Sequence, residues 1–114
     1  VVIGEDPYTE FFGDKDNLDL LKEDIETINN LKNKGYKVLV LLLSGRPMNI
    51  AEHINNWDGF AAVWLPGTEG DGVSDILFGD FQSTGKLSYP WPVNAEDGAN
   101  APEKELLYNI GFGL

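Results

Sequence analysis

The spacing of apolar residues changes along the first part of the chain, and each spacing predicts a different element. Val1–Gly4 is a short β-branched run that ends in glycine, which favours a strand. From Leu21 to Leu31 an apolar residue recurs every three or four positions, which predicts a helix with one buried face. Gly35 stands where a left-handed cap would end that helix. Lys37–Leu43 is apolar almost throughout, a pattern typical of a strand buried on both faces.

The following residues continue this alternation with weaker signals. A less regular pattern over Met48–Asn56 predicts a second helix, and the apolar run Gly59–Trp64 predicts the next strand. A third helix is expected to start near Thr68 and to end at Gly79. Lys86–Trp91 alternates apolar and polar residues, but the prolines in and after it restrict it to an edge strand.

The order of these elements is β-α-β-α-β-α-β. Such alternation with short connections predicts an α/β fold: a mostly parallel sheet with helices on both faces, which is a three-layer sandwich. We assign residues 1–92 to this sandwich domain. Residues 93–114 have no clear period, and we expect them to form a C-terminal tail that packs on this domain or on another one.

Charge and composition narrow the classes of function. The chain has 114 residues, with 8 basic and 19 acidic side chains and a net charge of −11. An acidic surface repels phosphate groups, so we expect neither nucleic acid nor an anionic membrane as a partner. The chain has no cysteine, which excludes thiolate metal sites, and its acidic loop at residues 14–19 lacks the register of a calcium loop. We therefore expect no metal and no cofactor.

Three segments should reach the edge where the strands end, because ligands bind beyond the carboxyl ends of strands in open α/β sheets. They are residues 5–8, 44–47 and 66–72. The third segment reads PGTEGDG, and its glycines let the backbone turn tightly and approach a ligand. Glu69 is the one large side chain in the middle of that turn.

The residues alone leave three interpretations of this loop open. Thr68 could cap the third helix, with Asp71 three residues later in place of the glutamate of a capping box. The loop could hold a phosphate, but Glu69 and Asp71 have the wrong charge, and the glycine spacing matches neither a dinucleotide fingerprint nor a P-loop. Glu69 could also be a catalytic carboxylate on a constrained loop, which is compatible with a capping role for Thr68.

Other polar residues at this edge have structural interpretations that we favour. Arg46 could form an ion pair with a loop carboxylate or help to shape a ligand cleft, and the ion pair is the favoured role. For Glu5 and Tyr8, hydrogen bonds that order their loop are favoured over catalysis. Trp64 ends a strand, so we expect its side chain in the core rather than stacked on a ligand.

Five segments, in order, resemble motifs of glycoside hydrolase family 3. PGTEGDGV, followed by DILFGD at residues 75–80, resembles the PGTEGxGVxDxLFGD segment of that family. The other four are GEDPYTE with a following GD (residues 4–14), SGRP (44–47), GKL with a following WP (85–92) and GFGL (111–114). Because their order and spacing agree from the first residue to the last, the chain resembles this family over its whole length. It departs at Asp71, where the family often has Gln, and in the ELLYNI run at residues 105–110.

The resemblance implies a two-domain, exo-acting, retaining β-glucosidase or exoglucanase. In such enzymes a barrel supplies the Asp nucleophile and the α/β sandwich that follows it supplies the acid/base Glu, and Glu69 is the matching position here. The barrel with its nucleophile and the first strands of the sandwich are absent from this chain. We therefore interpret the chain as a piece of a longer protein and expect it to be inactive alone.

The same resemblance implies the partners and the location. The expected substrates are β-glucans or β-glucoside oligosaccharides, cleaved at their non-reducing ends, and the expected protein partner is the barrel domain. The expected location is the periplasm or the outside of the cell. A stand-alone α/β module with a binding or structural role, without catalysis, remains the alternative. A flavodoxin-like or dinucleotide-binding domain is disfavoured because the fingerprint is missing.

Overall fold

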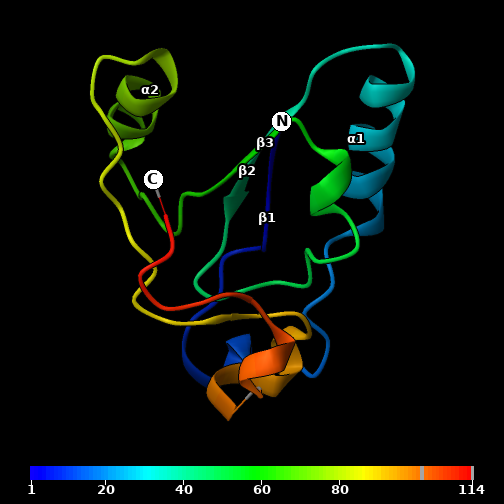
Figure 1. Cartoon of the computed structure of the whole chain (residues 1–114), viewed down its shortest axis with the longest axis vertical. Coiled ribbons are helices and arrows are strands. Elements are labelled where there is room, and N and C mark those ends of the chain that lie inside the picture. The colour runs from blue at the N-terminus through cyan, green and yellow to red at the C-terminus, as the bar shows by residue number, and fades with distance from the viewer. Residues whose placement is uncertain (101, 114) are drawn as a thin grey trace.

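Three parallel strands form the central sheet, in the order β1 (Val2–Gly4), β2 (Leu39–Leu43) and β3 (Gly59–Ala62). The computed structural model describes residues 1–100 and 102–113 of the chain. The helices α1 (Lys22–Asn33) and α2 (Gly70–Phe78) lie on opposite sides of this sheet (Figure 1). The predicted α/β sandwich with a mostly parallel sheet is confirmed.

A smaller antiparallel sheet lies at one end of the central sheet. It pairs β4 (Trp91–Pro92) with β5 (Leu106–Tyr108), so the last part of the chain packs against residues that precede it. Short 3₁₀ helices occupy several of the connections: η1 (Glu10–Gly13), η2 (Ile54–Asn56), η3 (Ala95–Asn100) and η4 (Glu103–Glu105). Within the described residues, no helix has the length and apolar character needed to cross a membrane.

The core lies between the sheet and α1. Ile28 of α1 is fully buried together with Val40 and Leu42 of β2, so the helix face that the apolar spacing predicts is the one that packs on the sheet. Acidic residues lie in the first turn of α1 and a lysine in its last turn, which complements the helix dipole. The chain leaves the helix through Gly35, whose φ is +85°, as predicted for a left-handed end.

The prediction that β2 is buried on both faces is wrong. Val40 and Leu42 are buried, but Leu39 is 42% exposed and Leu41 is only half-buried. The exposed face of β2 borders a shallow hollow that also includes Leu77 of α2. A continuous apolar run is typical of a strand covered on both faces, but within the described residues the face of β2 that carries Leu39 and Leu41 is only partly covered.

The predicted helix over Met48–Asn56 is also wrong, apart from the single turn of η2 at its end. The backbone at the start of this segment is instead bonded to residues from distant parts of the chain. The Met48 carbonyl accepts the indole N–H of Trp91 at 3.0 Å, and the Asn49 N–H donates to the Leu18 carbonyl at 2.9 Å. Met48 and Ile50 are nevertheless buried, so the apolar residues of this segment serve the core without helical geometry.

The predicted edge strand at Lys86–Trp91 is limited to its last residue, which opens β4. Proline has no N–H, so Pro90 cannot donate a hydrogen bond to a strand ladder. Leu87 instead forms two backbone hydrogen bonds with the terminal segment: its N–H donates to Phe112 at 2.8 Å, and its carbonyl accepts from Gly111 at 2.7 Å.

Candidate functional site

Glu5 and Arg46 join the loops that follow β1 and β2 at the carboxyl edge of the sheet. Arg46 Nη2 lies 3.0 Å from Glu5 Oε1, and Arg46 Nε lies 3.2 Å from Glu5 Oε2. The Ser44 hydroxyl donates to Glu5 Oε2 at 2.6 Å. The side chain of Glu5 is only 3% exposed. The ion pair between Arg46 and a loop carboxylate, which the sequence predicts, is therefore present and largely shielded from water.

Tyr8 completes this group and orders both loops. Its hydroxyl oxygen accepts the Gly45 N–H at 3.2 Å, and the Arg46 guanidinium lies over its ring at 4.4 Å from the ring centre. A Cβ on Gly45 would stand 2.6 Å from the Tyr8 hydroxyl oxygen, and one on Gly13 would stand 2.3 Å from Tyr8 Cδ2. Glycine is needed at both positions because the tyrosine approaches the backbone so closely.

The electrostatics of this group favour a charged Glu5. Burial by itself would raise the pKa of Glu5. The hydrogen bonds from Ser44, Arg46 and Tyr8, together with the positive charge of Arg46, outweigh burial and hold the pKa below its ordinary value. Lys15 adds a second, longer contact, with Nζ 3.4 Å from Glu5 Oε1. A carboxylate held ionised in this way is suited to fixing loops and not to donating a proton.

The third segment presents Glu69 at the start of α2. The turn before the helix has Gly67 at φ +59°, and the Glu69 N–H donates to the Pro66 carbonyl at 2.9 Å. Glu69 is exposed and occupies the N-cap position, one residue before α2 begins at Gly70. Its Oε1 accepts the Thr68 hydroxyl at 3.0 Å. The backbone of the turn is therefore fixed, while the carboxylate that it carries stays accessible.

The capping role proposed for Thr68 is not observed. No side-chain hydrogen bond caps α2, and the Thr68 hydroxyl contacts the neighbouring Glu69 carboxylate instead. The helix also starts later than Thr68, so Asp71 lies within the helix. Thr68 does contact the side chain of the candidate catalytic residue directly.

The three predicted segments form two separate groups. Glu5, Tyr8 and Arg46 are in direct contact, whereas no hydrogen bond or ion pair of the described residues joins Glu69 to any of them. Leu65 is the residue of the third segment that comes near the second loop, since a Cβ added to Gly45 would stand 3.4 Å from Leu65 Cδ1. Leu65 lies just before the turn that carries Glu69.

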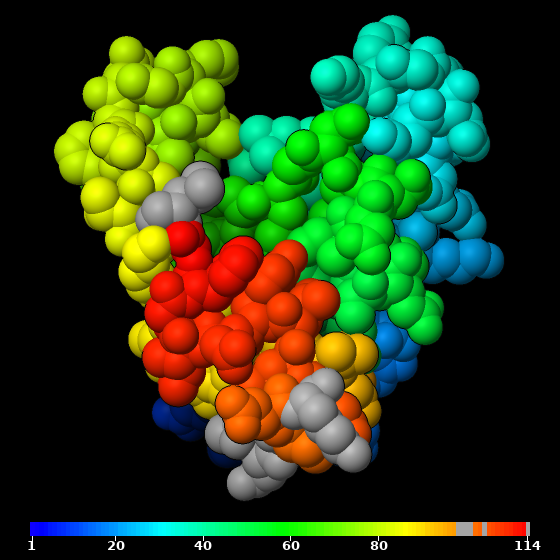
Figure 2. All heavy atoms as spheres, viewed as in Figure 1, coloured from blue at the N-terminus to red at the C-terminus, as the bar shows by residue number. Residues whose placement is uncertain are grey.

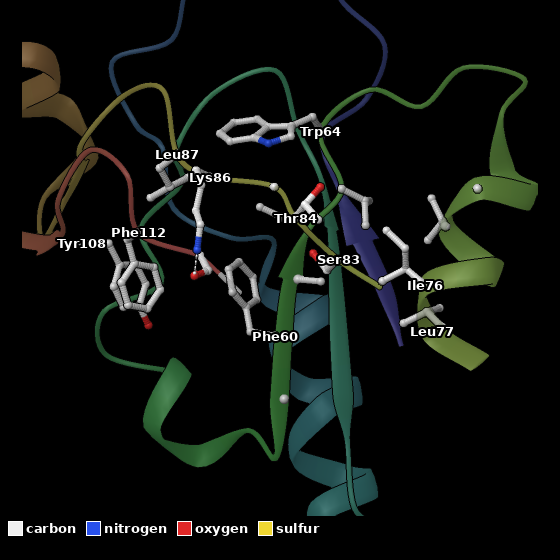
Figure 3. Close-up of a pocket in the computed structure, with 18 of the residues that line it drawn as sticks. Phe60, Trp64, Ile76, Leu77, Ser83, Thr84, Lys86, Leu87, Tyr108 and Phe112 are labelled. Atoms are coloured by element: carbon white, nitrogen blue, oxygen red, sulfur yellow. Dashed lines mark hydrogen bonds between the residues drawn. The ribbon is translucent and has the colours of Figure 1, made fainter. Parts of the chain in front are cut away.

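A cavity of about 930 Å³ opens between β3, α2 and the residues near the C-terminus. Its walls are mostly apolar, and Glu69 and Lys86 are the charged residues among those that line it. Figure 3 shows Ile76 and Leu77 of α2 on one side of the space and the stacked rings of Tyr108 and Phe112 on the other. Figure 2 shows α2 standing apart from the rest of the molecule, with a hollow beside it.

Two features of the site were not predicted. Ser44 is 2% exposed and donates to Glu5, a role for which the sequence offers only its place in the SGRP turn. Trp64 was expected in the core but is 39% exposed, and its φ is +53°. Residues with large side chains rarely have a left-handed backbone conformation, so the sequence gives no reason to expect one at a tryptophan.

The comparisons with known proteins agree with this architecture. The model of the Glycosyl hydrolase family 3 C-terminal domain matches residues 1–114. A periplasmic beta-glucosidase of Salmonella typhimurium is 31% identical over 77 residues, which are 67% of this chain and 10% of that protein. A xylan 1,4-beta-xylosidase of Xylanibacter ruminicola is 35% identical over 114 residues, covering 90% of this chain and 13% of that protein.

A solved structure gives the same result in three dimensions. The crystal structure of an exo-1,3/1,4-beta-glucanase from a Pseudoalteromonas species superposes with a TM-score of 0.87 and 38% identity, covering 99% of this chain and 16% of that one. The chain thus spans only about a tenth to a sixth of the length of these relatives. The family match over the whole chain confirms the resemblance seen in the five motifs, and the chain belongs to the glycosyl hydrolase family 3 C-terminal domains.

Proposed function

We propose that this chain is the part of a retaining, exo-acting β-glucosidase or exoglucanase that supplies the acid/base carboxylate, Glu69. The observation that carries the proposal is the placement of Glu69: an accessible carboxylate, on a turn held by Pro66 and Gly67, beyond the carboxyl end of β3. That edge of an α/β sheet is where ligands bind. Glu5, by contrast, is buried and paired, so it is not available to a substrate.

The chemistry needs a second carboxylate from outside this chain. In the first step Glu69 gives its proton to the glycosidic oxygen as the bond to the anomeric carbon breaks, and an Asp of the proposed barrel domain forms a bond to that carbon. Water then attacks the same carbon, gives a proton to the Glu69 carboxylate and releases the Asp. The two carboxyl groups must lie about 5–5.5 Å apart in such an enzyme.

The exposure of Glu69 supports a site that is completed by another domain. A carboxyl group that acts as a general acid near neutral pH needs burial or a neighbouring negative charge. Burial is not provided by the described residues, since Glu69 is exposed and its described side-chain contact is the Thr68 hydroxyl. In the proposed enzyme, docking of the barrel covers Glu69 and excludes water from the space between the two carboxylates.

Exposed apolar side chains also support contact with more protein. Several large ones are well exposed, and they would form part of an interface where they lie together in one patch. The most exposed of them are Val2, Phe11, Phe12, Leu65, Phe78, Phe81 and Ile110. We propose that the remainder of the enzyme covers part of this surface.

The substrate and location follow from the same proposal. The expected substrates are β-glucans or β-glucoside oligosaccharides, cleaved at the non-reducing end without a cofactor. The named relatives include a beta-glucosidase, a xylosidase and an exo-glucanase, which supports hydrolysis of a β-glycoside. The relative described as periplasmic supports a location in the periplasm or outside the cell.

The test replaces Glu69 in the two-domain protein. Glu69→Gln keeps the size of the side chain but removes the proton donor, so turnover of a β-linked disaccharide should fall by about 10²–10⁴-fold. An aryl glucoside with a strongly acidic leaving group needs no proton in the first step and should lose much less there. With Glu69→Ala, azide should restore turnover of the aryl glucoside and yield a glycosyl azide, because this nucleophile needs no general base.

Asp71→Asn is the matched control. It converts a nearby exposed carboxylate into an amide, and an amide already stands at this position in many members that the chain resembles. Its turnover of the disaccharide should stay close to that of the unchanged protein. Near-normal turnover of the disaccharide by Glu69→Gln would overturn the proposal and favour a module that binds or supports without catalysis.

A further inference from the structure

Trp64 has an unusual backbone conformation at the end of β3. Its φ of +53° lies in the left-handed region, where the described residues place only one other non-glycine residue, Glu10. Val63, immediately before it, is still tied to β2 by a hydrogen bond from its N–H to the Leu42 carbonyl at 3.0 Å. The chain therefore changes direction at Trp64 itself. Such strain in a large residue persists only where its surroundings enforce it, and it is concentrated at functional sites.

The side chain of Trp64 is anchored on a rigid part of the core. Its indole ring lies 6.0 Å from the ring of Trp91, centre to centre. Trp91 is 1% exposed, its N–H donates to the Met48 carbonyl, and its ring has an edge contact with Phe60 at 5.8 Å. Trp64, which is itself 39% exposed, thus packs on Trp91, which is almost completely buried in the core.

The backbone direction at Trp64 determines where the following turn, and with it Glu69, is placed. Pro66 has a fixed φ, and its carbonyl accepts the Glu69 N–H at 2.9 Å, so residues 66–69 form a closed turn. α2 begins directly after it. A rotation of the backbone at Trp64 would therefore swing this turn as a unit.

We propose that Trp64 is a positioning residue for the acid/base carboxylate: its indole, held on Trp91, maintains the left-handed backbone that sets the direction of the 66–69 turn and of Glu69. This inference rests on the proposed role of Glu69. Glycine would adopt the same φ without strain, so the presence of tryptophan shows that backbone freedom is not what the position needs. The ring packed on Trp91 fixes the direction of the backbone at this position, and a glycine has no side chain that could do so.

The experiment measures how hydrolysis by the two-domain protein depends on the leaving group. Trp64→Leu and Trp64→Gly should lower kcat/KM for a disaccharide by about 10-fold or more, because a misplaced general acid loses its effect. They should scarcely change kcat/KM for the aryl glucoside with the best leaving group. Trp64→Phe keeps an aromatic contact with Trp91 and should retain most activity on every substrate. Adding Trp64→Leu to Glu69→Gln should cause no further loss on the disaccharide.

Trp57→Leu is the control for loss of packing. Trp57 lines the same cavity and packs on Phe60 at 5.5 Å between ring centres, but its backbone has an ordinary φ of −93°. Its replacement should lower the unfolding temperature without changing the dependence on the leaving group.

The possible outcomes separate the two proposals. If Glu69→Gln is selective for poor leaving groups and Trp64→Leu is not, the positioning role is wrong while the role of Glu69 stands. If Trp64→Gly is as active as the unchanged protein, the ring is unnecessary and the inference is overturned. If Glu69→Gln shows no selectivity, the proposed function itself fails. If Trp64→Leu does not fold, Trp64→Gly and Trp64→Phe still decide whether the ring is required.

Discussion

Glu5 and Arg46 are 41 residues apart in the chain and form a side-on pair, with distances of 3.0 Å and 3.2 Å between their donor and acceptor atoms. The pair fastens the loop after β1 to the loop after β2 at the edge of the sheet where Glu69 is also presented. The Glu5 carboxylate is nearly inaccessible to water, so burying its charge costs free energy. Its hydrogen-bond partners offset that cost only while they are present.

Removal of Arg46 should therefore destabilise the fold. Arg46→Met keeps the aliphatic stem but leaves the Glu5 carboxylate buried without its main counter-charge. We expect a loss of about 3 kcal/mol in the free energy of unfolding, at the low end for a buried pair because Arg46 is partly exposed. Urea denaturation measures the change.

Lys22→Met is the control for that measurement. Lys22 and Glu26 form an exposed pair on α1 at 3.7 Å, with side chains 90% and 63% exposed. Its removal should cost less than about 0.5 kcal/mol. Equal effects of the two substitutions would show that burial does not matter for the Glu5 pair.

Stability should fall in acid, in part through Glu5. The pKa of Glu5 is held below its ordinary value in the folded protein, so its contribution to stability is complete above the unfolded pKa of about 4.3 and is lost as the pH falls through the lower, folded pKa. Glu5→Gln removes this dependence. The difference in unfolding free energy between the two proteins should be largest at neutral pH and should shrink toward pH 3. A difference independent of pH would contradict the assignment.

Two glycines of α2 should respond to alanine in opposite directions. Gly72 lies within the helix with open space around it, so Gly72→Ala should stabilise by about 0.5–1 kcal/mol through helix propensity. Gly79 ends the helix at φ +84°, so Gly79→Ala should destabilise by about 1 kcal/mol. Hydrogen exchange of the α2 amides, together with urea denaturation, measures both. The same sign for both would show that the helix end does not have this conformation.

The hydrogen bond from the Trp91 indole to the Met48 carbonyl should add to the stability that packing of the Trp91 ring provides. Trp91→Phe leaves the buried Met48 carbonyl without its indole partner and opens a small space, so we expect a loss of about 2–3 kcal/mol. Trp57→Phe changes the same residue type at a half-buried position and should cost about 1 kcal/mol or less. Thermal unfolding followed by circular dichroism compares the two variants.

The sequence pattern predicted an element correctly where the residues that stabilise the element lie within the same segment. α1 has its apolar period, its charge distribution and its terminal glycine within one segment, and it forms as expected. The segment from Met48 has a comparable share of apolar residues but does not form the expected helix. Its backbone groups are used by Leu18 and Trp91, which lie far away in the chain, and no local pattern carries that information.

The sequence by itself determined the three central strands and the helices α1 and α2 in their order along the chain, the helix face that packs on the sheet, and five ordered motifs that indicate the family. It also placed Glu69 on a glycine-rich turn at the correct edge of the sheet. Only the tertiary structure decided that Glu5 is buried against Arg46 while Glu69 stays accessible, and that Trp64 turns the chain through a strained conformation above Trp91. These outcomes depend on contacts between residues distant in sequence, and the energy of such contacts exceeds local conformational preference.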